Sequence, residues 1–122
     1  MQTMFQGLLK EVVEGTDGGV ASVVMDLDGI ALESYSKPDA SFDIMTIGIE
    51  LSVVIRSARQ AAEALGAGET QELAIIADQV TTVVRLVTPN YFVALSLAPG
   101  GNVGKGRYLL RTRAAELAGE LG

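Results

Sequence analysis

The residue types that most often perform catalysis near neutral pH are missing from this chain. Its 122 residues include no histidine and no cysteine. A thiolate nucleophile, a histidine general base, a disulfide and a zinc site with the usual ligands are therefore excluded. The side chains left for chemistry are carboxylates, lysines and arginines. Two segments, residues 26–29 and residues 99–113, place them in patterns that could bind a ligand.

Asp26 and Asp28 flank a turn, where two carboxylates could hold a metal or serve as an acid and a base. Aspartate is also common in hairpin turns because its side chain hydrogen-bonds the nearby backbone. The calcium-loop pattern with its closing glutamate is absent, and nothing near the turn supplies the burial that would give the two carboxylates distinct roles. The pair favours turn formation, and an enzyme that uses carboxylates alone is the weaker alternative.

The glycine-rich segment PGGNVGKG, residues 99–106, has the composition of a phosphate-binding loop. A Walker A loop requires a glycine where Pro99 stands and a serine or threonine where Gly106 stands, so the pattern fails at two positions. The segment predicts instead a turn, followed by a glycine that lets the last helix approach the sheet closely. No cofactor and no metal ion are expected.

Positive charges are concentrated near the end of the chain. They are Lys105, Arg107, Arg111 and Arg113. Glu116 and Glu120 follow them, which is typical of a solvated helix face. The alternative is a docking strip for an acidic partner.

Charge and composition limit the class of protein. Lysine and arginine number 9 against 15 aspartates and glutamates, a net charge of −6, which argues against a nucleic-acid-binding surface. With 48% hydrophobic residues, the chain can bury the core of a single domain over residues 1–122. No apolar run reaches the roughly 18 residues of a membrane span, and no signal peptide is recognisable, so we expect a cytoplasmic protein.

The first third of the chain predicts a helix and a β-hairpin. Apolar residues within the first fourteen positions follow helical spacing, and residues 15–19 end that helix. The members of this stripe are Met1, Met4, Phe5, Leu8, Leu9, Val12 and Val13. The pattern also predicts two strands, at residues 20–25 and 30–33, which are joined by the turn at residues 26–29.

The remainder predicts a long helix, three strands and a last helix. Residues 34–41 form a loop, Asp39 or Ser41 caps a helix over about residues 42–65, and the glycines of residues 66–68 end it. Strands at residues 73–77, 80–87 and 91–97 form an antiparallel meander, and a helix follows from residue 103. The expected fold is a three-layer α/β (α+β) sandwich in the order α-β-β-α-β-β-β-α. Its five-stranded antiparallel sheet carries the long middle helix on one face and the terminal helices on the other.

The middle helix carries apolar residues on two opposite sides. Its broad stripe is suited to cover the sheet and consists of Ile44, Ile47, Gly48, Leu51, Val54, Ile55, Ala58, Ala62 and Leu65. On the far side, Phe42, Ile49 and Val53 line up with Met45 at their edge. Because the predicted topology leaves no element to cover this second stripe, we interpret it as an interface, most simply between two copies of the chain. The alternative is that these side chains are isolated apolar residues on the surface, which need no functional explanation.

The element order resembles the Roadblock/dynein light-chain domain family. The resemblance is carried by Asp28-Gly29-Ile30 before the second strand, the long helix containing Gly48, and residues 102–107, in which Gly104 and Arg107 stand three apart. It implies a noncatalytic homodimer or heterodimer that pairs its middle helices and neighbouring strands into a ten-stranded sheet. Family members are platforms for Ras-like small GTPases or adaptors on dynein motors, and this chain is most similar to the bacterial MglB and MglC polarity regulators.

The resemblance places the paired helices and strands on particular residues of this sequence. They are Phe42, Met45, Ile49, Val53 and Arg56 for the helix, and Leu73, Ala74 and Ile75 for the strand. Neither Arg56 nor Arg59 is nominated as an arginine finger. The resulting hypothesis is a regulatory or scaffolding dimer that binds a Ras-like GTPase or a paralogous Roadblock subunit in bacterial polarity or motility control. The alternatives are a small-molecule sensor domain and a motor-cargo adaptor.

Overall fold

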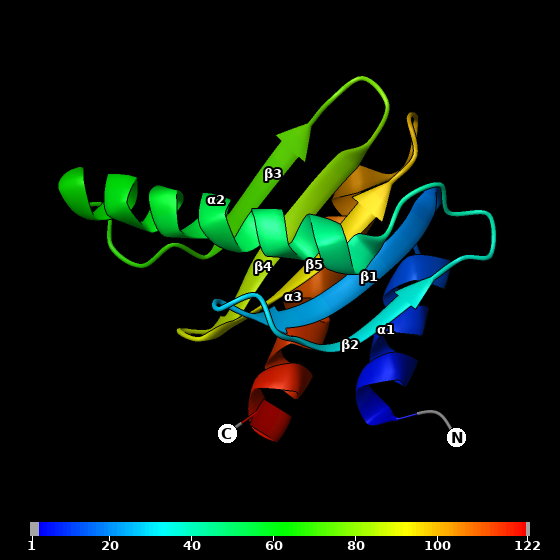
Figure 1. Cartoon of the computed structure of the whole chain (residues 1–122), viewed down its shortest axis with the longest axis horizontal. Helices are drawn as coiled ribbons and strands as arrows, with labels where there is room; N and C mark the ends of the chain where they lie inside the picture. Colours follow the sequence, from blue (N-terminus) through cyan, green and yellow to red (C-terminus); the bar gives the residue numbers. More distant parts are fainter. Residues whose placement is uncertain (1–2, 122) are drawn as a thin grey trace.

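Helices and strands follow one another in the predicted order (Figure 1), in a computed structural model that describes residues 3–121. The elements are α1 (Met4–Glu14), β1 (Gly19–Asp26), β2 (Ala31–Ser36), α2 (Ile44–Ala64), β3 (Glu72–Ile76), β4 (Thr81–Thr88), β5 (Tyr91–Leu97) and α3 (Val103–Leu121). Met1, which belongs to the predicted first stripe, lies outside the described residues. No helix within residues 3–121 is both long and apolar enough to cross a bilayer.

The five strands form one antiparallel sheet in the order β2-β1-β5-β4-β3. Hairpins join β1 to β2, β3 to β4 and β4 to β5, which confirms the predicted meander. The long connection that contains α2 carries the chain from one edge strand, β2, to the other, β3. Strand β5 then pairs with β1 and completes the centre of the sheet.

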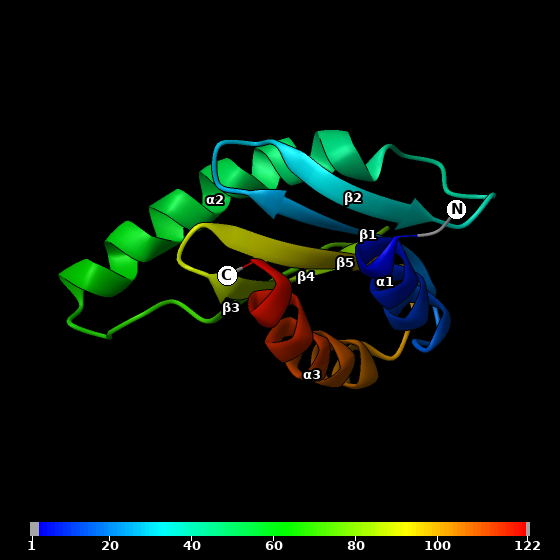
Figure 2. The ribbon, with the colours of Figure 1, turned by 90° about the horizontal axis from the view of Figure 1, so that it is seen from below.

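The sheet lies between two helical layers, as predicted (Figure 2). Helices α1 and α3 cover one face, where Leu9, Val13 and Leu110 are buried with Val93 and Leu95 of the sheet. Helix α2 covers the other face. Buried there are Met25, Leu51, Ile55, Phe92 and Ala94, which belong to β1, β5 and α2.

The central strands are apolar on both faces because successive side chains point to opposite sides of a sheet. In β5, Phe92 and Ala94 face α2, whereas Val93 and Leu95 face α1 and α3. The buried hydroxyl groups in this region have partners. Ser22 Oγ donates a 2.6 Å hydrogen bond to the carbonyl of Ala94, and the hydroxyls of Thr82 and Ser96 lie 3.1 Å apart.

Two predicted boundaries around the first loop are wrong. Strand β2 continues to Ser36 because Ser34, Tyr35 and Ser36 pair with β1, a long-range contact that local loop composition does not reveal. The middle helix begins after Asp43, whose carboxylate accepts a 3.0 Å hydrogen bond from the Met45 amide, so neither Asp39 nor Ser41 is its cap.

We expect Ile55→Ala to lower the free energy of unfolding by about 2–5 kcal/mol, because this fully buried side chain would leave a cavity between α2 and the sheet. Urea denaturation measures the change. Ile30→Ala is the matched control, since Ile30 is largely exposed and its removal should cost less than about 0.5 kcal/mol. Equal losses in the two variants would contradict the assignment of the α2 core.

Candidate functional site: an uncovered helix face and a free sheet edge

Helix α2 exposes a row of apolar side chains that its own sheet does not cover. Met45, Ile49 and Val53 follow one another at intervals of four residues and therefore lie along one line of the helix surface. Ile49 is 51% exposed and Val53 is 59% exposed, and Met45 is exposed as well. We call these three residues the outer row. These three members of the predicted second stripe are therefore not covered by the rest of the described chain.

The C-terminal part of α2 extends beyond the sheet. Figures 1 and 2 show the helix crossing the sheet and running out past the edge at β3. Its closest packing is with β1 and β2, at the other end of the helix. Val54 and Leu65 were predicted to face the sheet, but Val54 is exposed and Leu65 is 81% exposed. Leu65 is exposed because the sheet ends before the helix does. Val54 is exposed although the next residue, Ile55, is fully buried, so Val54 lies at the margin of the sheet-facing stripe.

Strand β3 is a free edge with apolar residues on both faces. It pairs only with β4, so the backbone groups on its other side have no strand beside them. Leu73 packs partly against the α2-side core, whereas Ala74, Ile75 and Ile76 are exposed. An edge of this kind is a template for pairing with another strand.

Two of the predicted helix-interface residues have different surroundings from those expected. Phe42 precedes α2 and is half-buried against the α2-side core, so it does not continue the outer row. Arg56 bonds the turn between β1 and β2. Its Nε lies 3.2 Å from the Leu27 carbonyl, which Nη2 also contacts, and Nη2 lies 2.9 Å from Asp28 Oδ1. Both side chains of this ion pair are exposed, so it adds at most about 1 kcal/mol to stability.

The aspartate turn and the glycine-rich segment, which could have bound a ligand, have structural roles. Asp26 Oδ1 accepts 2.9 Å hydrogen bonds from the amides of Asp28 and Ile30, which confirms the turn interpretation. In the glycine-rich segment, a Cβ on Gly106 would lie 2.9 Å from Leu95 Cδ2, which confirms the close approach of α3 to the sheet. Residues 3–121 contain no group of three acidic side chains placed to hold a metal ion.

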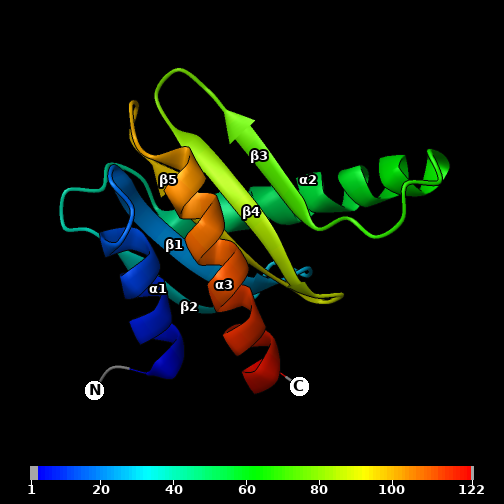
Figure 3. The same ribbon diagram turned by 180° about the vertical axis from the view of Figure 1, so that it is seen from behind.

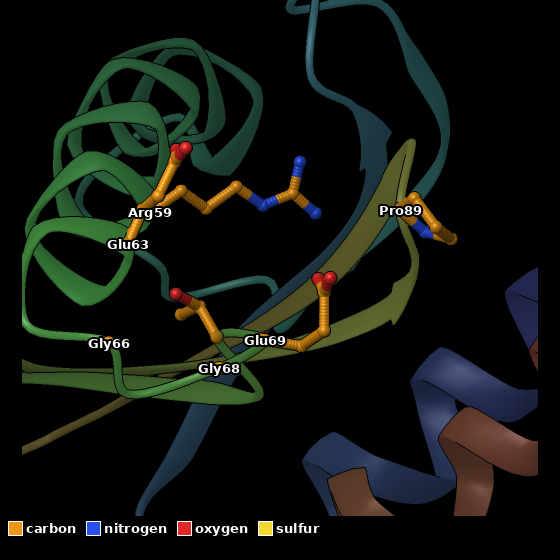
Figure 4. A pocket seen from close by; sticks show the side chains of 7 residues that line it. Arg59, Glu63, Gly66, Gly68, Glu69 and Pro89 are labelled. Carbon is orange, nitrogen blue, oxygen red and sulfur yellow. The ribbon is translucent and has the colours of Figure 1, made fainter.

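A hollow of about 560 Å³ lies between the C-terminal part of α2, the loop before β3 and the turn at Pro89 (Figure 4). Arg59 points into it from the helix, and its Nε and the Thr70 hydroxyl are buried without a hydrogen-bond partner. Most of the lining is charged side chains and glycines, such as Glu63, Glu69 and Gly68. Small-molecule sites are usually lined by apolar side chains, so this hollow does not favour a sensor domain.

An ion pair that the sequence analysis missed attaches β3 to α3. Arg107 donates from Nε to Glu72 Oε1 over 3.0 Å and from Nη2 to Glu72 Oε2 over 2.6 Å. These hydrogen bonds lower the pKa of Glu72 below its usual value, against the opposing effect of partial burial. The pair holds the exposed edge strand in place, and the only sequence signal for it is Arg107 in the last helix, three residues after Gly104.

We expect Glu72→Gln to destabilise the fold by up to about 1 kcal/mol near neutral pH. Because the folded-state pKa of Glu72 is lowered, the carboxylate stabilises the fold above the unfolded-state pKa of 4.5, and this contribution is lost as the pH falls through the folded value. Urea unfolding of both proteins between neutral pH and about pH 2 should show the difference vanishing in acid. A difference that persists there would contradict the ion pair. Glu120→Gln, at an exposed position of α3, is the control.

Comparison with known proteins identifies relatives of the whole chain. No family model and no curated protein matches the sequence. The crystal structure of MglC from Myxococcus xanthus is 36% identical, with a TM-score of 0.70, and the match covers 97% of this chain and 99% of that one. A Roadblock/LC7 domain from Streptomyces avermitilis has 14% identity and a TM-score of 0.84, with coverage of 99% and 98%.

The gliding protein MglB from Thermus thermophilus has 18% identity and a TM-score of 0.83, with coverage of 92% of this chain and 84% of that one. The last two similarities establish the fold alone. The identity to MglC over nearly the full length of both chains goes further. The chain belongs to the Roadblock domain family, among its MglB/MglC-like members.

Proposed function

We propose that this protein is a regulatory subunit without an active site of its own, which acts as a dimer and binds a Ras-like small GTPase or a paralogous Roadblock subunit. The observation that carries the proposal is the outer row of α2, which is apolar and uncovered by the rest of the described chain. Contiguous exposed apolar surface usually marks a site of protein association. The lack of histidine and cysteine supports a binding role over a catalytic one.

The dimer that we propose uses both uncovered features at once. Strand β3 pairs with β3 of a second copy, which satisfies the free backbone groups of both edges. The overhanging end of α2 then lies over the second copy's sheet, and the outer rows of the two α2 helices meet. Ile75, which shares the α2 face with Leu73 because side chains alternate along the strand, is covered in the same step. Such an arrangement has twofold symmetry, the most common symmetry of homo-oligomers.

Similarity to the Mgl proteins supports the biological side of the proposal. The MglB relative from Thermus thermophilus is described as a gliding protein, and another MglB structure has a tetrameric arrangement. We propose that this chain likewise self-associates and takes part in bacterial polarity or motility control. A dimer would present a continuous surface of paired α2 helices, which suits the docking of a folded partner such as a small GTPase.

We expect Ile49→Asp combined with Val53→Asp to halve the mass measured by light scattering while leaving the circular dichroism spectrum unchanged. A charge on the outer row has little effect on the free energy of the monomer, where water solvates it. The same charge destabilises a dimer in which it is buried without a partner. The control is Met4→Asp combined with Leu32→Asp, which changes exposed apolar residues on α1 and on the opposite edge strand, β2. The control should keep the wild-type mass. A wild-type protein that is itself monomeric would overturn the dimer.

We expect the wild-type chain to retain a Ras-like GTPase or a paralogous Roadblock protein from the same organism in a pull-down assay. The GTPase is presented separately with GDP and with a non-hydrolysable GTP analogue. The Ile49→Asp and Val53→Asp variant tests whether the bound partner needs the outer row. Failure to retain the GTPase in either nucleotide state, together with failure to retain the paralogue, would contradict the proposed partners.

A further inference from the structure

Cationic and aromatic side chains gather on the other face of the sheet, at the N-terminal half of α3. They line or border a hollow of about 290 Å³ beside β3 and β4. We name this surface the α3 patch, and its residues are Arg85, Lys105, Arg107, Tyr108 and Arg111. We propose that the α3 patch is a second docking surface, which binds an acidic peptide segment of a partner protein.

The α3 patch carries positive charge that its own chain does not neutralise. Glu72 is the only carboxylate in the lining of the hollow, and Arg107 uses both of its oxygens. Within residues 3–121, no carboxylate lies within 4.0 Å of the charged groups of Arg85, Lys105 or Arg111. On a chain with a net charge of −6, this is a local reversal of sign. Such a reversal favours association with a negatively charged group.

Tyr108 gives the patch an apolar centre. Its side chain is half-exposed, and the ring lies between two cations. Lys105 Nζ is 5.6 Å from the ring centroid and Arg111 Cζ is 5.7 Å from it. Contacts of this length between a cation and an aromatic face are attractive and hold the charged groups near the ring. A ligand that fits this arrangement has negative groups on either side of an apolar side chain.

The exposed end of β3 extends the apolar centre. Side chains alternate along the strand, so Ile76 shares the face of Glu72, whose carboxylate is bound by α3. Ile76 is 76% exposed. Acidic residues interspersed with aromatic or aliphatic ones would therefore meet complementary groups along the patch.

The size of the patch favours a short peptide over a nucleic acid or a membrane. The hollow accommodates a few side chains, and among residues 3–121 three cations of the patch, Arg85, Lys105 and Arg111, have no carboxylate partner. A duplex or a bilayer presents a broad negative surface, which the many carboxylates elsewhere on this acidic chain would repel. The pairing of Arg107 with Glu72 also illustrates how a guanidinium binds a carboxylate with two hydrogen bonds, the geometry open to Arg85 and Arg111.

The α3 patch lies on the opposite side of the sheet from α2. In Figure 3, α1 and α3 cross the near face while α2 lies behind the strands. A peptide bound at the patch leaves the outer row of α2 available to a second copy or to a GTPase. The inference therefore goes beyond the proposed function, and gives the protein a way to hold two different partners at once.

Selection of short random peptides displayed on phage against the immobilised wild-type chain tests the proposal. We expect enriched peptides to contain several aspartates or glutamates around an aromatic or aliphatic residue. For a fluorescein-labelled enriched peptide, Lys105→Glu combined with Arg111→Glu should weaken binding by about tenfold or more in fluorescence anisotropy. Tyr108→Ala should weaken it as well, whereas Tyr108→Phe should retain binding.

The matched control is Lys10→Glu combined with Lys37→Glu, which makes the same change of charge away from the patch and should alter affinity less than about twofold. Light scattering and thermal unfolding confirm that each variant keeps the wild-type mass and fold. Selection of peptides without acidic residues, or equal affinity of the control and patch variants, would overturn the proposal. So would patch-dependent binding of a short duplex DNA or of phosphatidylglycerol vesicles by a chain that binds no acidic peptide.

Discussion

The arrangement of this protein depends on a mismatch between helix α2 and the sheet that it covers. The helix is 21 residues long and is apolar around much of its circumference, while its own sheet covers one side and mainly its first half. Ile55 is fully buried, whereas Val53, only two positions away, is mostly exposed. Burial of apolar surface is the main driving force for folding and for association, so a helix with two apolar sides favours a second covering surface. The proposed dimer follows from this constraint.

Strand β3 presents the sheet edge that the same dimer would use. A five-residue strand at an edge has few backbone hydrogen bonds to hold it, and most of its side chains are exposed. The bidentate contact from Arg107 to Glu72 compensates in part, since it attaches the start of the strand to a helix on the other layer. The edge is thus held in a defined position while its outer backbone groups stay free to pair.

The sheet separates two kinds of surface. On the α2 side, the outer row and Ile75 are exposed apolar side chains that suit a dry, tightly packed contact with a folded protein. On the α3 side, arginine, lysine and tyrosine side chains surround a small hollow and suit a charged, extended segment. If both surfaces are used, the proposed dimer can bring a regulated protein and an acidic partner together on opposite faces of one sheet.

The sequence by itself determined the order of the elements and the apolar spacing at Ile49 and Val53, because these follow from local periodicity and turn residues. The layers followed from the rule that an apolar sheet needs helices on both faces. Only the tertiary structure decided that Leu65 is exposed, since that depends on where the sheet ends beneath the helix. It also decided that Arg56 binds the β1–β2 turn and that Arg107 binds Glu72, partners that are 28 and 35 residues apart. Long-range pairs of this kind arise from the packing of layers, and no local pattern encodes them.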